Sequence, residues 1–164
     1  MTIPPCGLLP LISPDCVALI LGSYPSLLSL QAGEYYANPR NMFWMIMESV
    51  LGIPHHLPYK ERISLLLNHK IGLWDVYASC MRKNSADARI HHPIPNDLKT
   101  LISHHPFIQV IFLNGREAEK GFKKFFPDAR IPTRYLPSTS PAYAIRLEEK
   151  TEMWKEVTRI VKRL

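Results

Sequence analysis

The sequence predicts an α/β protein: a single-domain α/β/α sandwich over residues 1–164, built around a central, mostly parallel four-stranded sheet. Residues 16–21 and 110–113 form two continuous apolar runs that end at small or polar residues, as strands buried on both faces of a parallel sheet do. Segments with helical apolar spacing alternate with such runs, which favours parallel βαβ units. A chain of 164 residues is long enough to bury one core without a disulfide or metal.

The elements expected after the first strand follow in chain order. A helix is expected over 41–51, because apolar residues recur there at helical spacing and Gly52 ends it. A second helix over 58–69 and a short strand over 71–77 come next. Residues 80–93 are polar, contain two arginines and one lysine, and have no apolar period, so they are predicted to form a functional loop.

The second half of the chain repeats the alternation. A helix is expected over 96–105, then the strand over 110–113 and an amphipathic helix containing Ala118, Phe122 and Phe125. A last strand over 133–136 precedes a C-terminal helix with one apolar and one charged face. Ligands of such sheets bind beyond the carboxyl ends of the strands, so the segments that follow the strands are expected to converge on one cleft.

The composition favours a soluble protein with a negatively charged partner. Twenty Lys and Arg against 14 Asp and Glu give a net charge of +6, which favours nucleic acid as that partner.

Cys6, Cys16 and Cys80 have no CxxC spacing, so neither a disulfide framework nor an iron–sulfur cluster is expected, and a reducing cytoplasm fits best. No signal peptide or membrane span is expected. Three pairs of adjacent histidines lack a further ligand at metal-binding spacing, so no metal site is expected.

Two kinds of segment carry candidate chemistry. Residues 23–26 and 137–141 are rich in hydroxyl groups and proline, a composition that lets backbone amides and hydroxyls approach a phosphate, although 137–141 could equally form a simple turn. Residues 35–44 combine aromatic rings with an arginine and two asparagines. Aromatic faces can stack an unpaired base, and amides can orient a water molecule; Trp44 is instead expected in the core.

Taken together, five segments resemble the uracil-DNA glycosylase superfamily, specifically its hypoxanthine-DNA (deoxyinosine) glycosylase branch. The segments cover nearly the whole chain in order and are 19–25, 35–44, 72–76, 111–115 and 136–142. The resemblance implies that a deaminated base is flipped out of DNA and its N-glycosidic bond is hydrolysed in base excision repair. The family motifs contain no lysine here, which implies a monofunctional enzyme. The expected enzyme is a cofactor-free monomer.

The resemblance also implies roles for individual residues. Asn41 is expected to orient the attacking water, and Ser23 stands where relatives have an Asp or Asn after the first strand. Phe43 is expected to stack on the flipped base, and Asp75 and Asn114 to contact its edge. Hypoxanthine N1–H and uracil N3–H are donors where adenine and cytosine present acceptors, so a carboxylate selects the damaged bases. This chemistry does not choose between hypoxanthine and uracil.

A last group of residues is expected to contact DNA. Arg82, Lys83, Arg89 and Arg116 could add to a positive rim of the cleft. Tyr143 replaces the asparagine usual in the family after Ala142, and it either fills the gap left by the flipped base or faces solvent. The DNA-binding candidates carried over are Ser26, Arg40, Arg82, Ser138, Thr139 and Ser140.

Two other functions stay open on the residues alone. The chain could be a nucleic-acid binding module that has lost catalysis, in which case it would bind DNA in a salt-dependent way without releasing a base. It could also be a hydrolase of free nucleosides or nucleotides, because its hydroxyl-rich segments suit a phosphate.

Overall fold

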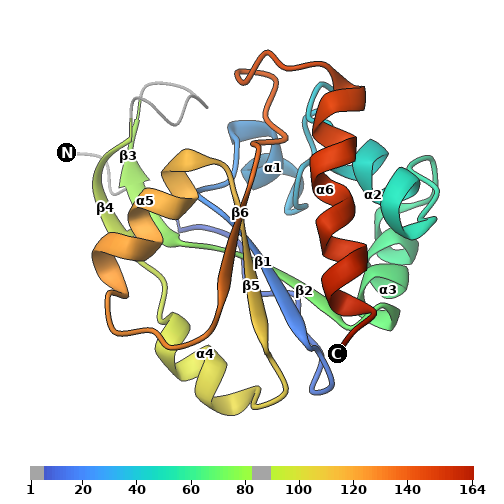
Figure 1. The fold of residues 1–164 in the computed structure, drawn as a ribbon. Coiled ribbons are helices and arrows are strands. Elements are labelled where there is room, and N and C mark those ends of the chain that lie inside the picture. The colour runs from blue at the N-terminus through green and yellow to red at the C-terminus, as the bar shows by residue number, and fades with distance from the viewer. Residues whose placement is uncertain (1–5, 83–89) are drawn as a thin grey trace.

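A four-stranded parallel sheet forms the centre of the protein in a computed structural model that describes residues 6–82 and 90–164 (Figure 1). The strand order is β2-β1-β5-β6, and every neighbouring pair is parallel. All residues of β1 and β5 are buried, which explains their continuously apolar sequences. The predicted fold class is confirmed. The strands are β1 (Ala18–Gly22), β2 (Ile71–Asp75), β5 (Val110–Asn114) and β6 (Thr133–Leu136).

Helices cover both faces of this sheet (Figure 1). Ile20 of β1 packs with Trp44 and Trp154 on the face covered by α2, α3 and α6. Its neighbour Leu21 packs with Phe122 on the face covered by α4 and α5, because successive side chains of a strand point to opposite faces. The helices are α1 (Leu27–Ala32), α2 (Phe43–Leu51), α3 (Tyr59–Asn68), α4 (Leu98–His104), α5 (Arg116–Phe125) and α6 (Leu147–Val161).

The region predicted as a polar loop at 80–93 differs from expectation. The strand predicted over 71–77 ends at Asp75, and a second strand β3 (Tyr77–Met81) pairs antiparallel with β4 (His91–Pro95). No residue of β4 is buried and its sequence shows no apolar alternation, so its pairing rests on backbone hydrogen bonds. The prediction of an uninterrupted loop was therefore wrong.

The short helix α1 was also absent from the prediction. It has six residues, too few for an apolar period to be recognised. Ser26 caps it by accepting a hydrogen bond from the Ser29 N–H, and Gly33 ends it with a left-handed φ of 67°. The helix lies beyond the carboxyl end of β1, so its cap stands beside the candidate site (Figure 1).

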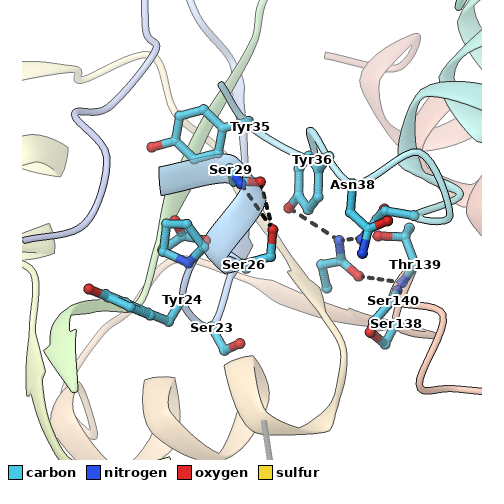
Figure 2. A pocket seen from close by; sticks show the side chains of 15 residues that line it. Ser23, Tyr24, Ser26, Ser29, Tyr35, Tyr36, Asn38, Ser138, Thr139 and Ser140 are labelled. Carbon is cyan, nitrogen blue, oxygen red and sulfur yellow. Dashed lines mark hydrogen bonds between the residues drawn. The ribbon is translucent and has the colours of Figure 1, made fainter. Parts of the chain in front are cut away.

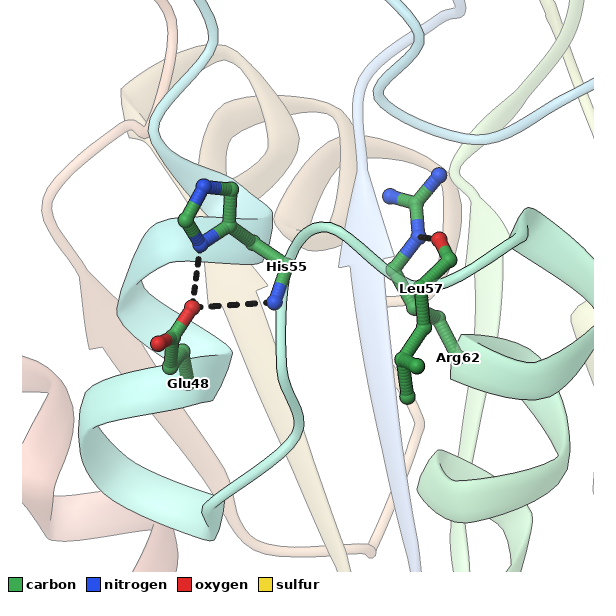
Figure 3. Close-up of polar contacts among 4 residues, drawn as sticks. All are labelled: Glu48, His55, Leu57 and Arg62. Carbon is green, nitrogen blue, oxygen red and sulfur yellow. Dashed lines mark hydrogen bonds and ion pairs between the residues drawn. The ribbon is translucent and has the colours of Figure 1, made fainter.

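The connection between α2 and α3 is held by two polar contacts (Figure 3). The carboxylate of Glu48 accepts the backbone N–H of His55 at 2.9 Å and contacts its ring, and these bonds lower the pKa of Glu48. Arg62 donates from Nε to the Leu57 carbonyl at 2.9 Å, with its guanidinium 4.7 Å from the ring centre of Trp44. Trp44 is 5% exposed, so its predicted core position is confirmed.

Within the part of the chain that the structure describes, no helix is both long and apolar enough to cross a membrane. The same residues contain no cluster of three or more histidine, cysteine, aspartate or glutamate side chains able to hold a metal ion. Cys6 is an exposed thiol, whereas Cys16 and Cys80 are buried thiols.

Candidate active site at the carboxyl edge of the sheet

A cavity of about 70 Å³ opens where the strands of the parallel sheet end (Figure 2). This volume has room for several water molecules. Residues that end or follow all four strands line it, so the predicted convergence of the strand ends is confirmed. None of the described residues of the predicted loop over 80–93 lines it, which corrects that part of the prediction. The lining residues are Gly22, Ser23, Tyr24, Pro25, Ser26, Ser29, Tyr35, Tyr36, Asn38, Asn41, Asp75, Asn114, Ser138, Thr139 and Ser140.

Asp75 places a carboxylate in this pocket. It is the last residue of β2, pairs with Gly22 of β1, and is 4% exposed. A Cβ added to Gly22 would lie 2.5 Å from the Asp75 carboxylate and 3.2 Å from the Tyr36 hydroxyl. Burial and, after it, the charge of Asp75 raise the pKa of Tyr35. The site therefore presents the carboxyl group of Asp75 on the pocket wall.

Replacing Gly22 with Ala should destabilise the protein, because the new methyl group would collide with the Asp75 carboxylate. Overpacking of this kind costs about 1–3 kcal/mol of unfolding free energy. Chemical denaturation of G22A and G52A separates this clash from backbone strain: Gly52 has a φ of 72° but nothing within 4 Å of an added Cβ. We expect G52A to lose about 1 kcal/mol of unfolding free energy and G22A to lose more. Unchanged stability of G22A would contradict the close contact between Gly22 and Asp75.

The aromatic residues that line the pocket are Tyr24, Tyr35 and Tyr36, and Phe43 is not among them. The Phe43 side chain is fully buried at the start of α2 and lies outside the pocket lining. The Tyr36 ring stacks on it with centroids 4.0 Å apart and planes 20° apart. In this structure Tyr36 therefore lines the pocket in place of Phe43, because the loop before α2 lays Tyr36 over that ring, and the contact of Phe43 with a base stays a prediction. Phe43 supports Tyr36 from behind.

Tyr36 is held in this place by several contacts. Its backbone has a left-handed φ of 56°, which costs a bulky residue about 1–3 kcal/mol and persists only where the surroundings enforce it. Its hydroxyl accepts a hydrogen bond from Asn114 Nδ2 at 3.2 Å. The next residue, Ala37, donates its N–H to Ser29 Oγ at 3.1 Å. Backbone strain at a pocket residue is typical of functional sites.

Asn114 links three parts of the site at the end of β5. Besides Tyr36, its Nδ2 donates to Thr139 Oγ1 at 3.1 Å, and its Oδ1 accepts the Thr139 N–H at 3.0 Å (Figure 2). Thr139 is 1% exposed and its hydroxyl is bonded to Asn114, and the predicted DNA contact at Thr139 stays a prediction. Its carbonyl accepts the Met42 N–H at 3.0 Å, which ties the 138–140 loop to the start of α2.

Two asparagines face the pocket from the turn before α2. Asn41 Oδ1 accepts the Phe43 N–H at 2.9 Å, and Asn38 Oδ1 accepts the Arg40 N–H at 2.9 Å. Each amide oxygen is thus fixed in direction, and a carbonyl oxygen has a second lone pair for another donor such as water. Ser23, 6% exposed, lines the same pocket from the end of β1.

The remaining hydroxyl groups lie along the pocket rim. Ser26 Oγ accepts the Ser29 N–H at 3.1 Å, Ser138 Oγ accepts the Ser140 N–H at 3.2 Å, and Ser140 Oγ accepts the Ala142 N–H at 3.2 Å. These bonds fix local turns of the backbone. Gly115, with φ of 100°, lies against Ser138, since an added Cβ would be 3.0 Å from the Ser138 Cβ.

The predicted arginines are distributed differently. Arg40 is exposed and lies outside the pocket lining. The Arg82 guanidinium lies 4.9 Å from the ring centre of Tyr24 and donates to the Pro25 carbonyl, so it braces a pocket wall. Arg116 lies 3.7 Å over the ring of Tyr135 and pairs with Glu119 at 3.0 Å. Lys83 and Arg89 lie outside the described residues.

Comparison with known proteins shows that the sequence of this chain is similar to those of DNA glycosylases. The family model described as the Uracil DNA glycosylase superfamily matches residues 9–162. A Methanosarcina acetivorans protein named hypoxanthine DNA glycosylase is 32% identical over 142 residues, covering 86% of this chain and 89% of the relative. A Methanosarcina barkeri protein of the same name is 29% identical over 151 residues, covering 92% of this chain and 95% of the relative.

A solved structure shares the fold as well. It is a solution NMR structure of a Methanosarcina acetivorans protein, described as a candidate uracil DNA glycosylase. It superposes with a TM-score of 0.83 at 29% sequence identity, covering 96% of this chain and 98% of the other.

Proposed function

Because this chain belongs to the uracil DNA glycosylase superfamily, we propose that it is a monofunctional DNA glycosylase that excises hypoxanthine, and also uracil, from DNA. The observation that carries the proposal is that Asn41, Tyr36 and Asp75 line one pocket at the carboxyl edge of the sheet. The names of the two Methanosarcina relatives support hypoxanthine as the first substrate.

The pocket supplies each requirement of base recognition. A base turned out of the duplex stacks on the face of Tyr36 that Phe43 leaves uncovered. The Asp75 carboxylate accepts N1–H of hypoxanthine or N3–H of uracil, whereas adenine and cytosine place an acceptor against it. Two acceptors facing each other in a buried pocket are strongly disfavoured, so the normal bases are rejected.

Asn41 serves the hydrolysis itself. Breaking the N-glycosidic bond passes through an oxocarbenium-like sugar, which a weakly activated water can attack. An amide cannot act as a strong base, but Asn41 Oδ1, held by the Phe43 N–H, can accept a hydrogen bond from that water and fix its direction. Ser23 lines the same pocket and is proposed to assist in holding the water.

Base release from DNA tests the proposal. Duplexes with one inosine or one uracil are incubated with the protein and then treated with alkali, which cuts the strand at an abasic site. We expect alkali-dependent cleavage at inosine and no cleavage of an undamaged duplex. DNA binding without base release would support a non-catalytic binding module, and equal release from free deoxyinosine would support a nucleoside hydrolase; either would contradict the proposal.

Replacing Tyr36 with Ala should lower kcat/KM on the inosine duplex. Stacking of a base on an aromatic ring is worth about 1–3 kcal/mol, so the expected loss is roughly 5- to 150-fold. Tyr36→Phe should keep most activity, since it keeps the aromatic ring and loses the bond from Asn114 Nδ2. Tyr35→Phe is the matched control, because its hydroxyl bonds the Leu9 carbonyl at 2.8 Å. Full activity of Y36A would contradict the stacking role.

We also propose that the enzyme is a cytoplasmic monomer that needs neither metal nor iron–sulfur cluster. Size-exclusion chromatography of the active protein in the presence of a chelator tests this: activity should elute at the size of one 164-residue chain.

A further inference from the structure

A lysine is fully buried beneath the loop at the pocket rim. Lys150, in the first half of α6, is 0% exposed. Its Nζ donates to the Ser140 carbonyl at 3.1 Å and lies 5.3 Å from the ring centre of Tyr143. Among the residues described by the structure, no carboxylate lies within the 4.0 Å of an ion pair with it. Burial accordingly lowers the pKa of this ammonium group.

A buried cation without an anion is costly for the folded state. A charge taken out of water is penalised by several kcal/mol unless it is paired, and an apolar side chain of similar volume is often as stable or more so. One carbonyl and one aromatic face offset only part of that penalty. Stability therefore gives no reason to keep a positive charge at this position.

The location of Lys150 suggests what completes its environment. The Ser140 carbonyl that it holds also accepts the Tyr143 N–H at 3.1 Å, which closes the turn over residues 140–143. The same loop carries Ser138 and Ser140 at the pocket rim. The ammonium thus lies behind the loop whose Ser138 and Ser140 hydroxyls line the pocket, and each hydroxyl accepts a backbone N–H and still has a hydrogen to donate. Such a loop, with a positive charge behind it, suits an anion.

We propose that Lys150 is a positioning residue for DNA: it fixes the Ser140–Tyr143 turn and supplies the positive charge against which this loop receives a phosphodiester of the bound strand. The role rests on the proposed function, because it takes the ligand to be DNA. Charges in a buried site are screened less than those in water, so one buried ammonium attracts a phosphate more strongly than a solvated lysine does.

Binding and stability measured together test this role. Affinity for an undamaged fluorescent DNA duplex is measured across a salt series for the unaltered protein and for Lys150→Met, Lys150→Arg and Lys155→Met. Lys155→Met is the matched control, because it removes the same charge from the same helix. Lys155 is exposed, and its Nζ pairs with a carboxylate oxygen of Glu152 at 2.6 Å. Thermal unfolding is recorded for each protein.

We expect K150M to unfold at or above the temperature of the unaltered protein, yet to bind DNA about tenfold more weakly. The slope of log affinity against log salt should fall by about one, and K150R should restore it, while K155M changes neither. If the unaltered protein binds DNA and K150M binds like K155M, the role of Lys150 is overturned and the proposed function stands. If the unaltered protein does not bind the duplex, the role of Lys150 is overturned, and base release from the inosine duplex decides the proposed function separately.

Discussion

Replacing Asn41 with Ala should lower the single-turnover rate of hypoxanthine release about 10²- to 10³-fold while DNA affinity stays near that of the unaltered protein. The side chain contributes one oriented oxygen to the attacking water, and positioned groups of this kind contribute roughly 10²- to 10⁴-fold. Because Asn41 Oδ1 also accepts the Phe43 N–H, the variant should lose about 1 kcal/mol of unfolding free energy. This loss of stability leaves the variant folded and is too small to account for the slower release of hypoxanthine.

Two further variants separate catalysis from structure. Asn41→Asp keeps both an oxygen acceptor and the bond to the Phe43 N–H, so it should retain much of the activity. Asn38→Ala removes a neighbouring pocket amide, whose oxygen accepts the N–H of the exposed residue Arg40. The rate of hypoxanthine release by this variant should stay within about tenfold of that of the unaltered protein. If N38A is the inactive variant and N41A is active, the assignment of the water-orienting residue is wrong.

Replacing Asp75 with Asn should lower kcat/KM on the inosine duplex about 10- to 100-fold, with little change in fold because the two side chains have the same shape. Hydrogen bonds to a charged group are worth about 1.5–3 kcal/mol, and the amide presents a weaker acceptor and a competing donor. The preference for inosine over adenine should shrink by a similar factor, since an amide can donate to the acceptor of adenine.

Asp97→Asn provides the matched control for that change. Asp97 caps α4 by accepting the Thr100 N–H at 3.1 Å, lies outside the pocket, and can be replaced by another good capping residue at little cost. Its kcat/KM on the inosine duplex should equal that of the unaltered protein. Base selection by Asp75 would be contradicted if D75N and D97N had the same ratio of activity on inosine and adenine.

The elements that the sequence predicted are those with a long, local signal. The strands over 16–21 and 110–113 were recognisable because both faces are buried, and α6 because its apolar face repeats over 15 residues. The antiparallel pair β3–β4 and the six-residue α1 carry no such pattern. Backbone pairing and capping create them, and neither leaves a period in the sequence.

In the site, the residues placed by the sheet topology could be predicted, whereas those placed by tertiary contacts could not. Asp75 and Asn114 could be placed at one edge because parallel strands end together. Which aromatic ring faces the pocket could not be predicted, since Tyr36 covers Phe43 only through a left-handed backbone and the bond from Asn114. Lys150 belongs to a helix expected to have a charged face, and only the fold of residues 137–143 buries it.

A structure of the Asn41→Ala variant bound to a duplex with one inosine tests the central claim most directly, because slowed hydrolysis leaves the base attached. We predict the hypoxanthine ring out of the helix and stacked on Tyr36, with its N1–H donated to the Asp75 carboxylate and a phosphate against the loop over 138–140. An inosine that stays paired in the duplex, or a flipped base bound away from Tyr36 and Asp75, would contradict the account.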